Sequence, residues 1–170
     1  MASLTLAIIG AGPFGLAQAA WAADAGIDYA IIGYPMQFWR EHMPEGMRLR
    51  STAEWHLDTP GEWTMDRFFA ERGGAPTGPL ARERDEFRAA AGASPYIQGS
   101  VSRMPLLNGP DGPIVKTREG FPVLDDRFQS SVPRLFITSM AASGDFGPFF
   151  GFTVSARVSA RQIGRAILHG

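Results

Sequence analysis

The stretch LTLAIIGAGPFGLAQAAWAADAG, residues 4–26, decides the fold of this chain. It carries no charge before Asp24, so it fits an export signal, a membrane segment, or a buried strand that leads into a buried helix. No Lys or Arg precedes the apolar run, and glycines and a proline interrupt it, which disfavours both the signal and the membrane segment. We therefore expect a buried strand over 4–10 and a helix that starts at Pro13 and stops at Gly26.

A second apolar strand, IDYAIIG at 27–33, completes a strand–helix–strand unit of about 30 residues. Gly10-x-Gly12-x-x-Gly15 stands directly after the first strand and opens the helix. In such a fingerprint Gly10 permits the tight turn, Gly12 lets the backbone approach a pyrophosphate, and Gly15 lets the helix pack closely on the strand. Because the free N–H groups of a first helical turn favour an anion, this pattern predicts dinucleotide binding.

Composition limits the remaining possibilities. The 170 residues are 45% hydrophobic and 19% charged, which is typical of a soluble globular domain. A net charge of −1 gives no global field for nucleic acid or an anionic membrane, so we expect neither as a partner. The chain has no cysteine, which excludes disulfides and thiolate metal sites and suits a reducing compartment, so we expect a cytoplasmic protein.

Beyond this unit the apolar patterns predict a further set of elements. The final helix carries a stripe of Arg157, Arg161 and Arg165 at i, i+4 spacing, which we interpret as a solvated basic face near the helix C-terminus. The predicted elements are, in chain order, an irregular packed segment at 34–64, short helices at 64–72 and 80–93, a small antiparallel β-meander at 96–125, a buried strand at 134–139 and a helix over about 150–168.

One position departs from the dinucleotide fingerprint. An acidic residue is expected at the end of the second strand, where it holds the ribose hydroxyls, but Gly33 stands there. The nearest upstream carboxylate, Asp28, lies at the start of that strand. Either the ribose is held differently or the nucleotide site is altered.

Three blocks of the chain resemble the class B flavin-dependent monooxygenases. These include the flavin-containing monooxygenases, the lysine/ornithine N-hydroxylases and related FAD/NAD(P)-binding proteins. The resemblance implies an α/β fold, a Rossmann-like three-layer FAD-binding domain with a small β-meander, over the single domain 1–170. In the related group the second strand also ends in glycine before a Pro-Met-x-x-Trp pattern, as at Gly33, Pro35, Met36 and Trp39. The blocks are AIIGAGPFGL, IIGYPMQFWREHMPEGMRLRS and FPVLDDRFQSSVPRLFITSMAASGDFGPFFGF.

By this resemblance the diphosphate of FAD lies over residues 10–15 and the adenosine end lies near Gly33, with the backbone around Val101 reaching the adenine. The flavin ring lies between the 39–51 loop and the 146–149 turn, and a helix N-terminus after residues 147 and 148 faces its pyrimidine edge. For Arg50 the alternative is a salt bridge with Glu41 or Glu45. The implied cofactor-binding residues are Gly10, Gly12, Pro13, Phe14, Gly15, Gly33, Tyr34, Trp39, Arg50, Ser51, Val101, Ser139, Phe146, Gly147 and Phe149.

The chain lacks the second dinucleotide domain that such enzymes use for NADPH. There is no second GxGxxG, and the roughly 100–150 residues of that domain are missing at a junction near 94–104. Ser139 also stands where the family's last strand usually ends in glycine. We therefore expect reduction of the flavin by a separate reductase or by the substrate itself. The face that the missing domain would cover suggests a homodimer, with Phe149, Phe150 and Phe152 either covering it or packing the core.

Three residues are candidates for proton transfer at the flavin: His56, Asp58 and Asp145. For Asp145 the alternative is a helix N-cap, and the spacing of His42, His56 and Asp58 fits no metal site. The sequence thus predicts an FAD-dependent oxidoreductase for a small organic molecule. The alternatives are a non-redox pocket enzyme, such as a cyclase or isomerase, and a flavin- or ligand-binding subunit.

Overall fold

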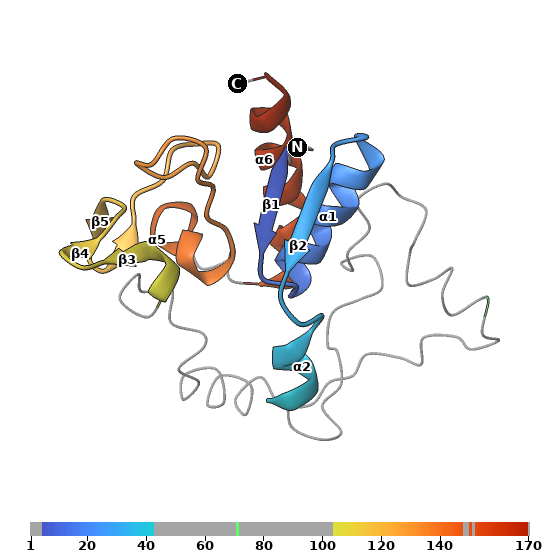
Figure 1. Ribbon diagram of the computed structural model, residues 1–170, viewed down its shortest axis with the longest axis horizontal. Helices are drawn as coiled ribbons and strands as arrows, with labels where there is room; N and C mark the ends of the chain where they lie inside the picture. Colours follow the sequence, from blue (N-terminus) through green and yellow to red (C-terminus); the bar gives the residue numbers. More distant parts are fainter. Residues whose placement is uncertain (1–4, 43–70, 72–103, 148–149, 151, 170) are drawn as a thin grey trace. The chain divides into compact units, whose positions relative to one another are not determined.

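The computed structural model describes residues 5–42, 71, 104–147, 150 and 152–169 (Figure 1). The chain divides into two compact units, Met1–Arg82 and Glu83–Gly170, and each is described here by itself. The predicted helices at 64–72 and 80–93 fall outside the described residues, apart from Glu71, which is helical.

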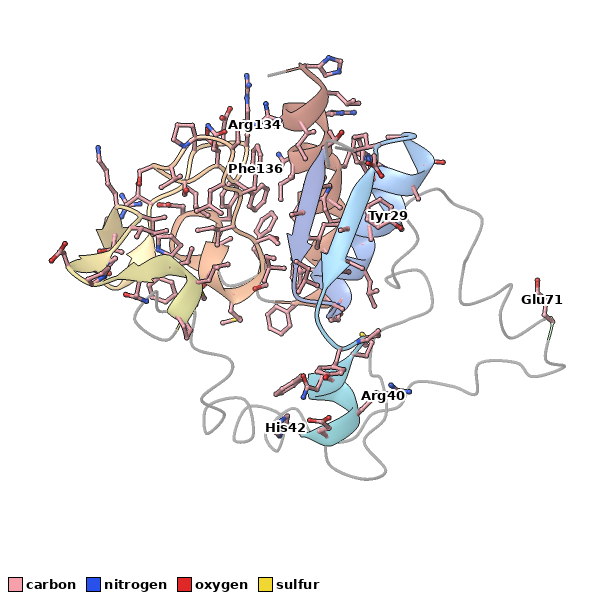
Figure 2. All side chains as sticks on the ribbon, in the orientation of Figure 1. Tyr29, Arg40, His42, Glu71, Arg134 and Phe136 are labelled. Carbon is pink, nitrogen blue, oxygen red and sulfur yellow. The ribbon has the colours of Figure 1, made fainter. Side chains whose placement is uncertain are left out.

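The first unit is built on a parallel strand–helix–strand unit, as the sequence predicts. Strand β1 (Leu6–Ile9) leads into helix α1 (Pro13–Asp24), and strand β2 (Tyr29–Ile32) returns beside β1 (Figures 1 and 2). The two strands pair in parallel, with Leu6 opposite Tyr29 and Ile9 opposite Ile32, and α1 packs against both. The observed elements are shorter than predicted, because Gly10, Ile27 and Asp28 lie outside the strands and Ala25 and Gly26 form the turn after α1.

The ends of α1 follow from local chemistry. Pro13 occupies the first helical position, where its missing N–H breaks no bond and its fixed φ suits the helix. The helix ends where Gly26 takes the left-handed region with φ +67°. After β2, Met36 (φ 55°) precedes a short helix, α2 (Gln37–Glu41), which was not predicted in the segment 34–64. Five residues are too few for a helical periodicity to show in the sequence.

In the second unit two hairpins take the place of one continuous meander. After a 3₁₀ turn, η3 (Pro105–Leu107), strands β3 (Asn108–Gly109) and β4 (Gly112–Pro113) pair, and β5 (Thr117–Arg118) pairs with β6 (Phe121–Pro122). The β5–β6 turn places Glu119 and Gly120 at φ 52° and 84°, as in type I′ hairpin turns. Among the described residues every sheet has two strands, so the three-layer Rossmann-like domain remains a prediction.

The buried strand predicted at 134–139 does not form. In this segment the structure has an isolated antiparallel bridge between Phe136 and Gln129 (Figure 2). Arg134 and Ser139 take φ values of 63° and 67°, so the backbone leaves the extended region at both ends of the stretch. The apolar residues are still used, because Ile137 is buried. The apolar pattern therefore marked burial here and not strand geometry.

The last part of the chain packs a helix on an aromatic cluster. The short helices η4 (Ser139–Ala142) and α5 (Ser143–Phe146) come first, then the 3₁₀ turn η6 (Thr153–Ser155) and helix α6 (Ala156–His169). The predicted final helix is present but starts later than residue 150. Ile163 of α6 packs with the fully buried Phe128 and Ala142, and Phe146 stacks on Phe128 with 3.9 Å between ring centroids.

Candidate functional site

The candidate site is the loop that joins β1 to α1 in the first unit. Gly10 takes φ +98°, a conformation that favours glycine. Its N–H donates to the Ile32 carbonyl at 2.7 Å, and the Met36 N–H donates to the Ala11 carbonyl at 2.9 Å. These two bonds fix both sides of the loop against the end of β2, so the loop is preorganised.

Two glycines set how closely the loop is packed. A Cβ at Gly15 would lie 1.8 Å from the Gly10 carbonyl oxygen, and a Cβ at Gly33 would lie 3.0 Å from the Ala11 nitrogen. Gly15 therefore has the close-packing role that the fingerprint predicts. The short distance at Gly33 gives a physical reason why glycine stands where the fingerprint expects an acidic residue. Any side chain at Gly33 would crowd the loop backbone and would stand at φ +138°, a conformation that residues other than glycine rarely adopt.

Gly12 has the opposite environment. Nothing lies within 4 Å of a Cβ built at this residue, and its φ of −80° suits any amino acid. Gly12 is the N-cap of α1 and has no side chain to bond the first helical turn, which contains no acidic residue. In the described part of the chain, the N–H groups of Phe14 and Gly15 have no hydrogen-bond partner. The open space beside Gly12 is therefore next to the free N–H groups of Phe14 and Gly15 and to the positive end of the α1 dipole. Together these groups can hold an anion.

Two further predicted residues of the first unit, Tyr34 and Trp39, follow β2. Tyr34 follows Gly33 directly and is largely exposed. The backbone of Trp39 lies in α2, and its side chain is outside the description. Six predicted site residues fall outside the described residues altogether: Arg50, Ser51, His56, Asp58, Val101 and Phe149.

Four predicted site residues belong to the second unit: Ser139, Asp145, Phe146 and Gly147. Ser139 stands in the left-handed region, the conformation that the family's glycine would adopt without strain. Phe146 uses its ring to stack on Phe128, so it serves the core of this unit. Gly147 takes φ 82°, and its N–H closes α5 on the Ser143 carbonyl at 3.0 Å. The predicted helix start after residues 147 and 148 falls where residues 148, 149 and 151 lie outside the described part of the chain, and Phe150 is in a 3₁₀ conformation.

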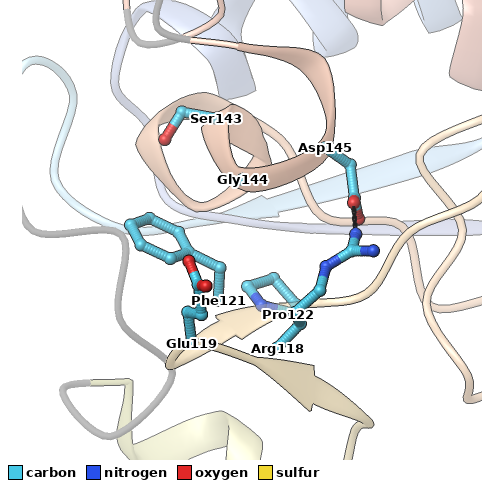
Figure 3. A pocket seen from close by; sticks show the side chains of 7 residues that line it. All are labelled: Arg118, Glu119, Phe121, Pro122, Ser143, Gly144 and Asp145. Atoms are coloured by element: carbon cyan, nitrogen blue, oxygen red, sulfur yellow. Dashed lines mark hydrogen bonds and ion pairs between the residues drawn. The ribbon is translucent and has the colours of Figure 1, made fainter.

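The Asp145 carboxylate is fully engaged (Figure 3). Oδ2 accepts a hydrogen bond from the Leu124 N–H at 2.7 Å, and Oδ1 forms an ion pair with Arg118. These contacts tie α5 to the β5–β6 hairpin, and Gly144 brings the two even closer, because a Cβ there would lie 2.8 Å from that of Phe121. Neither the N-cap nor the proton-transfer role predicted for Asp145 is seen in this geometry.

A pocket of about 160 Å³ lies beside this ion pair. It is lined by Arg118, Glu119, Phe121, Pro122, Ser143, Gly144 and Asp145. Sequence reasoning did not find Arg118 as a partner of Asp145, since 27 residues separate them and no motif links them. The Ser143 hydroxyl donates to the Met140 carbonyl at 2.7 Å. Among the polar side chains of this pocket, Arg118 and Asp145 thus hold the hairpin to α5, and Ser143 bonds within its own segment.

The described residues contain no group of three or more His, Asp or Glu side chains placed to hold a metal ion. None of their helices is both long enough and apolar enough to cross a membrane. In comparisons with known proteins, no family model, no curated protein and no solved structure matches the chain.

Proposed function

We propose that the β1–α1 loop binds the diphosphate of FAD and that the chain is an FAD-dependent oxidoreductase for a small organic molecule. One observation carries the proposal. In a single loop, Gly15 is a glycine because a side chain would clash, whereas Gly12 faces open space at a helix N-terminus. Local packing does not require a glycine at Gly12, but the close approach of a ligand does.

The residues of the loop fit the group. The Phe14 and Gly15 N–H groups donate to phosphate oxygens, and Gly12 lets the backbone approach them. Gly10 holds the turn through its bond to Ile32. FAD, when bound, supplies the electron-transfer chemistry. The choice of FAD over another dinucleotide rests on the resemblance of the three sequence blocks to the class B monooxygenases.

The source of electrons follows from the same resemblance. Because the chain has no second GxGxxG, we propose that a separate flavin reductase or the substrate itself reduces the flavin. A homodimer in the cytoplasm completes the proposal. These parts rest on sequence alone.

A non-redox role is the second candidate, and Gly33 favours it. A side chain at Gly33 would be strained, and the carboxylate that usually holds the ribose is absent from the end of β2. A chain that holds FAD without turnover would serve as a binding subunit or as a pocket enzyme for an isomerisation or cyclisation. The redox and the non-redox roles are separated by reducing the bound FAD with an added flavin reductase and then supplying a substrate. Only the redox protein then passes electrons from the flavin to that substrate.

The binding step is tested by titrating the purified chain with FAD and following flavin fluorescence. Gly12→Val should weaken binding roughly 100-fold, the value of one or two lost hydrogen bonds to a charged group. Ala20→Val is the matched control, because Ala20 is exposed on α1 away from the loop. Equal affinities of Gly12→Val and wild type would show that the diphosphate lies elsewhere.

A further inference from the structure

The exposed face of α6 is basic along its whole length. Arg157, Arg161 and Arg165 are all exposed and repeat every four residues, so the row runs for about 12 Å along the helix. The helix contains no Asp or Glu. No ion pair in the described part of the chain includes any of the three arginines.

The expected solvated basic face near the C-terminus of α6 does not explain the whole row of three arginines. Cations are favourable near a helix C-terminus, where Arg165 and His169 lie. Arg157, however, lies far from this end, because the helical segment begins with η6 at Thr153 and Arg157 follows within two turns. Like charges at i, i+4 also repel each other on a helix surface. An anionic partner along the row would relieve this repulsion.

Two apolar side chains accompany the arginines. Val158 is 41% exposed and Leu168 is 53% exposed, and both share the face opposite the buried Ile163. We call Arg157, Val158, Arg161, Arg165 and Leu168 the α6 outer face. Arginine combined with apolar contact is typical of the centre of protein–protein interfaces.

We propose that the α6 outer face is a docking surface for an acidic protein segment, of which a helix with carboxylates at the same four-residue spacing is the simplest form. The row of three arginines is as long as a row of three carboxylates at four-residue spacing on a partner helix. Membrane-binding polybasic segments usually carry four to eight cations, and nucleic-acid sites make more phosphate contacts still. The proposal does not depend on flavin binding.

The test uses the full chain and a fluorescent helical peptide of about 15 residues with Glu at every fourth position. Fluorescence anisotropy should show weak binding, with a Kd below about 1 mM, that weakens severalfold as NaCl rises from about 50 to about 300 mM. Arg161→Glu should weaken binding about tenfold or more. Arg127→Glu is the control, because it removes an exposed arginine of the same unit outside α6 and changes the net charge equally.

Folding is checked by circular dichroism, and Arg161→Gln, which adds no negative charge, should show an intermediate loss. No binding to wild type at about 1 mM peptide would overturn the proposal. Equal losses in Arg161→Glu and Arg127→Glu would do so too, because they would indicate a general charge effect. Tighter binding to vesicles of phosphatidylcholine and phosphatidylserine, or to poly(U) RNA, would identify the face as a site of another class.

Discussion

A methyl group added at Gly15 should destabilise the fold strongly. A methyl group added at Gly12 should leave the fold nearly as stable as before but should impair FAD binding. At Gly15 the new Cβ would lie 1.8 Å from the Gly10 carbonyl oxygen, and such contacts essentially never fall below 3.0 Å. The start of α1 and the Gly10 carbonyl must therefore separate by at least 1.2 Å, the difference between these two distances. The obstacle is backbone and cannot rotate away, so we expect Gly15→Ala to cost about 3 kcal/mol in the free energy of unfolding, at the upper end of overpacking effects.

For a chain of this length the Gly15→Ala loss corresponds to a fall in Tm of about 6–12 °C. Gly12→Ala should cost less than about 1 kcal/mol, because it meets no atom and only the N-cap preference opposes it. It should nevertheless weaken FAD binding, because its Cβ obstructs the approach of the backbone to the diphosphate. Thermal unfolding followed by circular dichroism, with and without FAD, measures both variants. A Gly15→Ala protein as stable as wild type would refute the close approach of α1 to β1.

Three further changes test other parts of the structure by thermal unfolding. Ser139→Gly removes a left-handed serine and should raise stability by up to about 1 kcal/mol after the entropic cost of glycine, so a lower Tm would contradict the strain. Asp145→Asn keeps an acceptor for the Leu124 N–H but loses the ion pair, and should cost about 1 kcal/mol. Arg118→Ala should cost less, because Arg118 is 64% exposed, and the reverse order would argue against the clamp. Gln18 is buried, and in the described part of the chain its amide has no partner, so Gln18→Leu should stabilise by about 1 kcal/mol. Destabilisation by that change would reveal a partner for the amide.

The strand–helix–strand unit was predictable from the sequence because its determinants are local. An uncharged apolar run, a proline at the first helical position and three spaced glycines act within a few residues of one another. The reason for Gly33 was not predictable, since it depends on the distance between the end of β2 and the loop backbone. The sequence showed only that an expected carboxylate was missing.

Elsewhere the prediction failed where conformation depends on contacts far along the chain. The apolar residues of 134–139 indicate burial, but the left-handed Arg134 and Ser139 prevent a strand, and neither residue type announces that conformation. The pairing of Asp145 with Arg118 joins a hairpin to a helix that the sequence does not place together. The sequence therefore offered Asp145 only as a candidate for proton transfer or as an N-cap, whereas the structure shows its carboxylate bound to Arg118 and to the Leu124 N–H.

The central claim is that the β1–α1 loop holds the diphosphate of FAD. The most direct measurement is the stoichiometry of FAD on the purified full chain, from the visible absorbance of oxidised flavin after saturation with FAD and removal of the excess. We predict one FAD per chain for wild type and a much lower stoichiometry for Gly12→Val, whose affinity is about 100-fold weaker. A folded wild-type protein that takes up no FAD would contradict it.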